Sequence, residues 1–138
     1  MQDIIEEILA VAALAKEVSW NMRGIGSLSL RPYLDNALFN GALRQVGLIA
    51  DHMVSTGLYG DPRFTLGNFE TFPQLLVKPD PRRFIVGVEQ VIQQLTYLTD
   101  LLDEYLVNET DDPVGQHIIT GALQEFNNHH WRLSCLTV

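Results

Sequence analysis

The chain has 138 residues, 46% of them hydrophobic and 19% charged, which is the composition of a folded globular protein rather than of a disordered one. Its net charge of −8 disfavours nucleic acid as a partner, because affinity for phosphates comes largely from Lys and Arg. No apolar run approaches the roughly 18 residues that a membrane span needs, and the acidic start MQDIIEEILA differs from a signal peptide. We therefore expect one domain over residues 1–138. The single cysteine, Cys135, closes no disulfide within the chain and favours a cytoplasmic location.

Residues 4–22 predict an amphipathic helix. Apolar side chains recur there every three or four residues, which places them on one helix face. These residues are Ile4, Ile8, Val11, Ala15, Val18 and Met22. Gly24 and Gly26 are expected to end the helix, because glycine favours the left-handed backbone found just beyond helix C-termini.

A second helix is predicted from near Pro32, a residue that suits a first helical turn, to Gly57. Its apolar face is predicted to consist of Phe39, Leu43, Val46, Ala50 and Met53. The connection that follows spans about residues 58–78, a length at which connections usually carry structure of their own. We expect residues 68–76, NFETFPQLL, to supply a short extra helix there.

Asp80 and Pro81 predict the start of a third helix, and Asp112 is the predicted N-cap of a fourth that begins at Pro113. The third apolar face is predicted to consist of Val88, Val91, Leu95, Leu98, Leu102 and Tyr105. The fourth is predicted to consist of Ile119, Leu123, Phe126, His130 and Leu133. Four such faces can bury one another, so the sequence predicts an all-α four-helix bundle.

Histidines are the candidate metal ligands on residue type alone. His130 falls on the fourth apolar face and His52 adjoins the second, so each is either a hydrogen-bonded core histidine or a ligand. Glu125 and His129 are four residues apart and share a helix face, with His129 at the edge of the apolar stripe. The Glu-x-x-His pairs of a di-iron bundle are absent. Cys135 is interpreted as a buried structural thiol rather than as a nucleophile.

Three segments resemble Dps-type miniferritins. Residues 19–24, SWNMRG, are similar to the His-Trp-Asn-(Met/Val)-Arg-Gly segment that ends the family's first helix. Residues 50–69 resemble its Ala-Glu-Arg-x-x-x-Leu-Gly-Gly segment and the short helix after it, and residues 111–133 resemble its last helix. The resemblance implies a ferritin-like bundle with an extra helix in the second-to-third connection, assembled as a hollow homododecamer or a mixed shell with a paralogue. It also implies that Trp20 and Trp131 are packing and interface anchors.

The family binds two iron ions between neighbouring subunits. Its ligand positions fall in this sequence at Ser19, Arg31, Asp35, Val46 and Ala50. Only Asp35 retains a family ligand, since Val46 and Ala50 offer no ligand atom. Arg31 is expected to pair with Asp35. A slip of one residue would present Asp51 or His52, but one residue corresponds to about 100° of rotation on an α-helix. We therefore expect the ferroxidase site to be lost or altered.

The family's shell has pores lined by the loop before the last helix, where this chain carries Glu109, Asp111 and Asp112. Without the shell, these acidic residues are expected to form a solvated loop with one capping residue.

The resemblance implies iron storage and stress protection, here without ferroxidase ligands and without a basic DNA-binding tail. One alternative is an active iron oxidase with atypical ligands from Asp35, Asp51 and His52. Another is a small metal- or ligand-binding bundle of the DinB-like kind, with His52 and His129 or His130 in its core.

Overall fold

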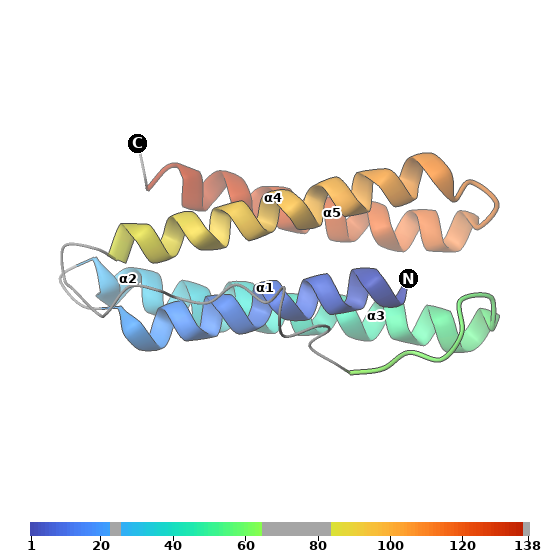
Figure 1. The fold of residues 1–138 in the computed structure, drawn as a ribbon, viewed down its shortest axis with the longest axis horizontal. Coiled ribbons are helices and arrows are strands. Elements are labelled where there is room, and N and C mark those ends of the chain that lie inside the picture. The colour runs from blue at the N-terminus through green and yellow to red at the C-terminus, as the bar shows by residue number, and fades with distance from the viewer. Residues whose placement is uncertain (23–25, 65–83, 137–138) are drawn as a thin grey trace.

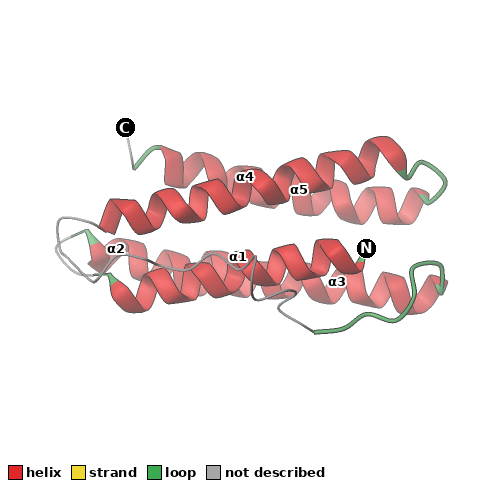
Figure 2. Cartoon of the chain, in the orientation of Figure 1, coloured by secondary structure: helices red, strands yellow, loops and turns green. Residues whose placement is uncertain are grey.

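A computed structural model describes residues 1–22, 26–64 and 84–136 of the chain. Their regular structure consists of α1 (Gln2–Asn21), α2 (Ser27–Pro32), the π-helix η1 (Tyr33–Phe39), α3 (Asn40–Thr56), α4 (Phe84–Asn108) and α5 (Pro113–Ser134). Because the junction residues keep right-handed helical angles, α2, η1 and α3 form one continuous rod. The described part of the chain is therefore four helical rods without a strand (Figure 2), which confirms the predicted all-α bundle.

The rods pack in two layers, with α1 beside α3 in one layer and α4 beside α5 in the other (Figure 1). Contacts of α1 with α4 and of α3 with α5 join the layers. α3 and α4 run in the same direction, because α3 ends at the end of the bundle opposite to the one where α4 begins (Figure 1). The predicted helix at 68–76 and the predicted cap Asp80 lie outside the described residues.

The apolar faces predicted for the first and third helices are confirmed. Every predicted residue of both faces is buried in the core. Spacing of three and four residues keeps successive apolar side chains on one side of a helix, which is the side that these two helices bury. Each helix in the described ranges is too short or too polar to cross a membrane.

The second and fourth faces are confirmed in part. The predicted members that are buried are Val46, Met53, Ile119, Phe126 and Leu133. Ala42 and Ile49 are buried on α3 where Leu43 and Ala50 were expected, and Ala122 and His129 are buried on α5 where Leu123 and His130 were expected. Since those five predicted members stay buried, each face is turned by less than the roughly 100° of one residue.

The helix ends are confirmed at two places and corrected at one. Gly57 ends α3 with a left-handed φ of 66°, and Asp112 caps α5 by accepting a hydrogen bond from the Gly115 N–H. The second rod begins at Ser27 rather than near Pro32. Pro32 lies inside it, and the π-helix follows directly, because proline lacks the N–H that a regular helix needs at that point.

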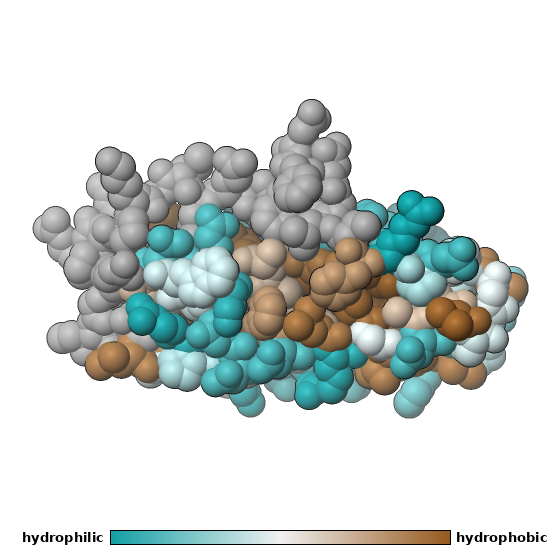
Figure 3. Space-filling view, turned by 90° about the horizontal axis from the view of Figure 1, so that it is seen from below, coloured by the Kyte–Doolittle hydropathy of each residue, from teal (hydrophilic) through white to brown (hydrophobic). Residues whose placement is uncertain are grey.

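Apolar side chains also lie on the outside of the α1–α3 layer. Figure 3 shows apolar surface in the middle of this face, with polar side chains along one edge. Leu48 and Val54 of α3 are 47% and 69% exposed, and Leu58 and Phe64 in the segment after α3 are exposed too. Such a surface is typical of a protein that binds a partner, because a monomer gains nothing from exposing it.

Candidate functional site

The contact between α3 and α5 contains four of the six buried polar side chains in the described part of the chain. Gln45 and His52 come from α3, Asp112 caps α5, and His129 lies on α5. A buried polar group is costly unless it has a hydrogen-bond partner, so these residues determine how the two helices meet. They form two clusters, one at the N-terminal end of α5 and one further along it.

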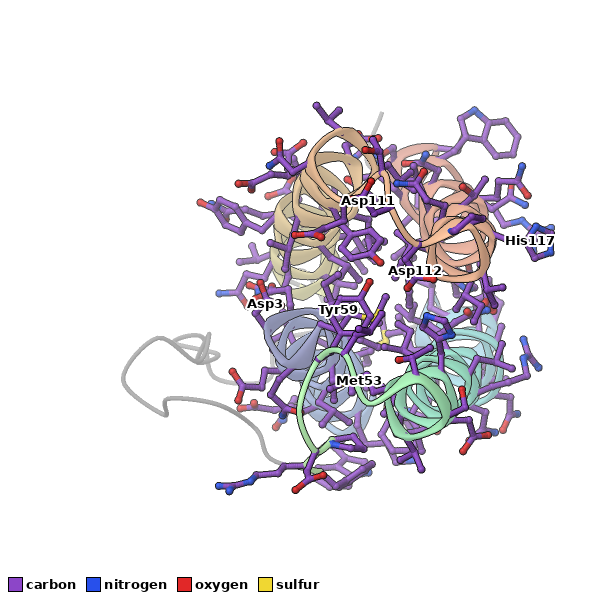
Figure 4. The ribbon with its side chains drawn as sticks, turned by 90° about the vertical axis from the view of Figure 1, so that its right-hand side faces the viewer. Asp3, Met53, Tyr59, Asp111, Asp112 and His117 are labelled. Atoms are coloured by element: carbon purple, nitrogen blue, oxygen red, sulfur yellow. The ribbon has the colours of Figure 1, made fainter. Side chains whose placement is uncertain are left out.

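The Asp112 cluster consists of Asp112, His52, Tyr59, Tyr105 and the backbone N–H of Gly115. Asp112 Oδ2 lies 2.6 Å from His52 Nε2 and accepts a 2.7 Å hydrogen bond from the Tyr59 hydroxyl. The Tyr59 and Tyr105 hydroxyl oxygens are 2.8 Å apart, and Asp112 Oδ1 accepts from Gly115 N at 3.1 Å. Figure 4 shows Tyr59 and Asp112 together at this end of the bundle. The cluster therefore joins α3, the segment after it, α4 and α5.

The hydrogen bonds and burial of this cluster determine which of its side chains carry a charge. Burial by itself would raise the pKa of Asp112, but donors from His52, Tyr59 and the Gly115 N–H outweigh burial and lower it. Burial raises the pKa of Tyr59 and Tyr105, and the neighbouring Asp112 charge adds to the rise for both. At neutral pH the carboxylate is therefore charged and both tyrosines keep their protons, which makes the cluster a structural clamp.

The predicted acidic loop divides into two parts. Asp112 is buried and both of its carboxylate oxygens accept hydrogen bonds within the chain, so it is not part of a solvated acidic surface. Its predicted role as a cap is confirmed. Glu109 and Asp111 are exposed, and a pore made by them stays a prediction. Beside the cluster lies a cavity of about 210 Å³ lined by Tyr59, Tyr105 and acidic side chains that include Glu104 and Glu109.

The Glu125 cluster lies further along α5 and consists of Glu125, Arg44, Gln45, His129 and Tyr33. Arg44 Nη2 donates to Glu125 Oε1 at 3.0 Å, and Gln45 Nε2 donates to Glu125 Oε2. His129 Nε2 lies 3.9 Å from Glu125 Oε1, beyond hydrogen-bond distance. On the other side of the ring, His129 Nδ1 is hydrogen-bonded to the Tyr33 hydroxyl. The cluster thus connects α3, η1 and α5.

Two buried atoms of this cluster have no hydrogen-bond partner among the described residues, His129 Nε2 and Gln45 Oε1. Burial lowers the pKa of His129, and the positive charges of Arg132 and Arg44 lower it further against the opposing effect of Glu125. The imidazole is therefore neutral at pH 7 and carries a lone pair on one ring nitrogen. Native proteins rarely leave buried polar atoms without a partner, so these two atoms call for an explanation.

The core histidine of α5 is His129 and not His130, so the prediction was wrong by one residue. His129 is 6% exposed, whereas His130 is half-buried and its Nε2 lies 3.0 Å from Thr96 Oγ1 of α4. The alternation of three and four residues fits either neighbour, and the packing of α5 against α3 selected His129. His117 is exposed, as expected for the first turns of that helix.

The positions where the resemblance places iron ligands contain a different interaction. Ser19 and Asp35 do come together, with Ser19 Oγ donating to Asp35 Oδ1 at 2.6 Å. The ammonium of Lys16 forms an ion pair with the same oxygen at 3.4 Å. Arg31 does not supply that charge, since its Nη2 donates to the Met22 carbonyl at 2.6 Å. The expected pair of Arg31 with Asp35 was therefore wrong, and Lys16 takes its place.

The other degenerate positions, Val46 and Ala50, are four residues apart and share one face of α3, whereas Asp51 and His52 are turned away from it. Val46 is buried in the core and Ala50 is half-buried, while Asp51 is exposed and His52 is held by Asp112. These four residues all lie in the regular helix α3, so a step from Ala50 to Asp51 is a rotation of about 100°, as expected. Asp51 is accordingly exposed to solvent next to the half-buried Ala50. In the described ranges, no three His, Cys, Asp or Glu side chains converge as metal ligands. A metal site that takes Asp35, Asp51, His52 or His130 stays a prediction.

Both tryptophans lie on the surface of the chain. Trp20 and Trp131 are each 65% exposed, so neither is a packing anchor of the bundle, although an interface role stays a prediction. Helix periodicity did not predict that they are buried, because neither belongs to one of the predicted apolar faces. Cys135 is exposed as well, which contradicts the expected buried thiol.

Sequence reasoning missed Tyr33, Gln45, Tyr59 and Tyr105 as site residues. Tyr33 and His129 are 96 residues apart, and Tyr59 and Asp112 are 53 apart, so no local pattern links them. Only the turn residues around Tyr59, in GLYGDP, indicated that its backbone would fold back on the bundle. No family model matches the chain, and no solved structure matches it.

Proposed function

We propose that this protein is a shell-forming subunit of the Dps-like kind that stores or sequesters iron without oxidising it between subunits. The helix order supports a ferritin-like architecture, because a single long crossover between parallel second and third helices distinguishes ferritin-like bundles from simple up-and-down ones. The proposal places the protein in the cytoplasm, where its one thiol would stay reduced.

The observation that carries the proposal is the meeting of Ser19 and Asp35. These positions are 16 residues apart, and the family uses them for two ligands of one iron site. Their side chains lie together, as that site requires, but a hydroxyl replaces the imidazole and the Lys16 ammonium takes up the carboxylate charge. A fixed internal cation in this place opposes the binding of a metal ion by like-charge repulsion.

Self-association is supported by the apolar surface. Trp20 and Trp131 occur near the ends of α1 and α5, which lie at the same end of the bundle (Figure 1). Leu48 and Val54 add apolar surface on α3. Covering the exposed part of one such tryptophan is worth about 3 kcal/mol, so a few of them supply much of the free energy that assembly needs. The occupant that the proposal assigns to these surfaces is a second copy of the chain.

Native mass spectrometry and iron oxidation together test the proposal. A dodecameric mass is expected, and ferric absorbance after addition of Fe(II) with oxygen or peroxide should rise no faster than in a protein-free blank. A monomeric mass at micromolar protein concentration would refute the shell. Oxidation faster than the blank would refute the loss of activity.

The alternative of an active oxidase is favoured by one observation, the exposed carboxylate of Asp51 on α3. An Asp51→Asn variant separates the two functions. If oxidation exceeds the blank and Asp51→Asn abolishes it, the atypical-ligand oxidase is correct. If the variant oxidises iron as fast as the unmodified protein, Asp51 is not a ligand.

A further inference from the structure

The Glu125 cluster contains unused ligand atoms in the interior of one chain. His129 is 6% exposed and Gln45 is 8% exposed, and each has a buried atom without a hydrogen-bond partner among the described residues. Both side chains lie against Glu125, which brings a carboxylate to the same place. An imidazole nitrogen, a carboxylate oxygen and an amide oxygen are all atoms that coordinate divalent metal ions.

We propose that the Glu125 cluster binds one divalent transition-metal ion per chain, with His129 Nε2, Glu125 Oε1 and Gln45 Oε1 as its protein ligands. The site is separate from the inter-subunit position of Ser19 and Asp35, since it is made by α3 and α5 of a single chain. A borderline-soft ion of the Zn²⁺ class fits the mixture of one nitrogen and two oxygens. Water would complete the coordination.

The distance between the histidine and carboxylate ligand atoms suits such an ion. Two ligand atoms that each lie about 2.0–2.1 Å from a tetrahedral metal are roughly 3.3 Å apart. His129 Nε2 and Glu125 Oε1 are 3.9 Å apart, so a side-chain movement of about half an ångström closes the difference. At 3.9 Å the two atoms are too far apart to satisfy each other directly.

The tyrosine next to the ring contacts the ring nitrogen that does not approach Glu125. Ligating histidines usually hydrogen-bond through the ring nitrogen that does not bind the metal, which fixes the tautomer and the ring orientation. The Tyr33 hydroxyl contacts His129 Nδ1 in this way and leaves Nε2 toward Glu125. Tyr33 begins the π-helix η1, and short π-helical turns occur frequently at functional sites.

A glycine makes room for the carboxylate. A Cβ on Gly41 would lie 2.6 Å from Glu125 Oε1, closer than real contacts allow, so an alanine there would displace the carboxylate from its present position. Arg44 currently neutralises the same oxygen from the surface, with its side chain 67% exposed. The arginine therefore competes with the metal and can swing into solvent when the metal binds.

Titration with Co²⁺ tests the proposal on tag-free protein treated with a chelator. The expected result is visible d–d absorption that saturates at one ion per chain and is reversed by Zn²⁺. Glu125→Gln and His129→Gln keep the size of the side chains and should each weaken binding at least about tenfold. Gly41→Ala should weaken it as well, through displacement of the carboxylate. Circular dichroism of each variant checks that the bundle is intact.

Arg44→Gln gives the sharpest discrimination from a purely structural cluster. Removal of the competing charge should raise Co²⁺ affinity several-fold, whereas a structural role of Glu125 predicts no gain. His117→Gln and His130→Gln are matched controls on the same helix and should leave affinity unchanged. Equal affinity of the unmodified protein and the Glu125→Gln and His129→Gln variants, or the absence of d–d absorption at about 1 mM Co²⁺, would overturn the proposal. The measurement is per chain, so it holds whether or not the shell forms.

Discussion

Asp112→Ala should destabilise the protein by about 3–5 kcal/mol, because a single carboxylate accepts hydrogen bonds from His52, Tyr59 and the Gly115 N–H. Loss of the N-cap interaction accounts for about 1 kcal/mol. Loss of the acceptor for the His52 and Tyr59 donors adds about 1–2 kcal/mol each, since His52 Nε2 loses its partner and Tyr59 exchanges a bond to a charged group for the Tyr105 hydroxyl alone. For a chain of this size the sum corresponds to a decrease in melting temperature of roughly 10–20 °C.

Urea unfolding followed by circular dichroism measures the effect as a lower midpoint with an unchanged slope. Asp112→Asn is the graded variant: asparagine still caps α5 but loses the charge, so it should cost about 1–2 kcal/mol. Asp111→Ala is the matched control, because Asp111 is adjacent and exposed, and it should change the free energy of unfolding by less than about 0.5 kcal/mol. A cost for Asp112→Ala as small as that of Asp111→Ala would show that the cluster does not clamp the helices.

The same carboxylate predicts a pH dependence. The folded-state pKa of Asp112 is lowered, so its contribution to the free energy of unfolding is complete above the unfolded pKa of about 4 and is lost as the pH falls through the folded value. The difference in stability between the unmodified protein and Asp112→Asn should therefore stay constant above about pH 5 and shrink in acid. A difference that grows in acid would contradict the assignment. Gly115→Ala should lower the free energy of unfolding by about 1–3 kcal/mol, because a Cβ there would collide with Asp112 Oδ2. Gly121→Ala on the same helix is the control: its Cβ meets nothing within 4 Å, so it should be neutral or stabilising in the same urea assay. Trp131→Ala should leave the melting temperature of an isolated chain nearly unchanged, because the side chain is 65% exposed, yet lower the native mass of the assembly; an unchanged mass would exclude Trp131 from the interface.

Local sequence pattern was sufficient for the parts of the fold that depend on neighbours along the chain. The apolar faces of α1 and α4, the left-handed Gly57 and the cap at Asp112 follow from spacing and backbone preference over a few residues, and the structure has all of them. Within the candidate site, the pattern predicted the capping role of Asp112 and a buried or ligating His52.

The remaining site features were decided by packing between helices. Periodicity of three and four could not choose between His129 and His130, because adjacent residues fit the alternation equally well, and contact with α3 made the choice. The partner of Asp35 could not be read from spacing either, since Lys16 reaches it across the gap between two helices.

What the sequence by itself determined is thus four helices, two of their ends at Gly57 and Asp112, and two of their faces in full. Only the tertiary structure decided that Tyr33 meets His129, that His52 meets Asp112, and that two buried atoms beside Glu125 stay without partners in the described part of the chain. The physical reason is the distance along the chain over which each interaction acts. Helix periodicity and capping act over one or two turns, whereas a buried hydrogen bond between helices depends on the register in which two rods pack.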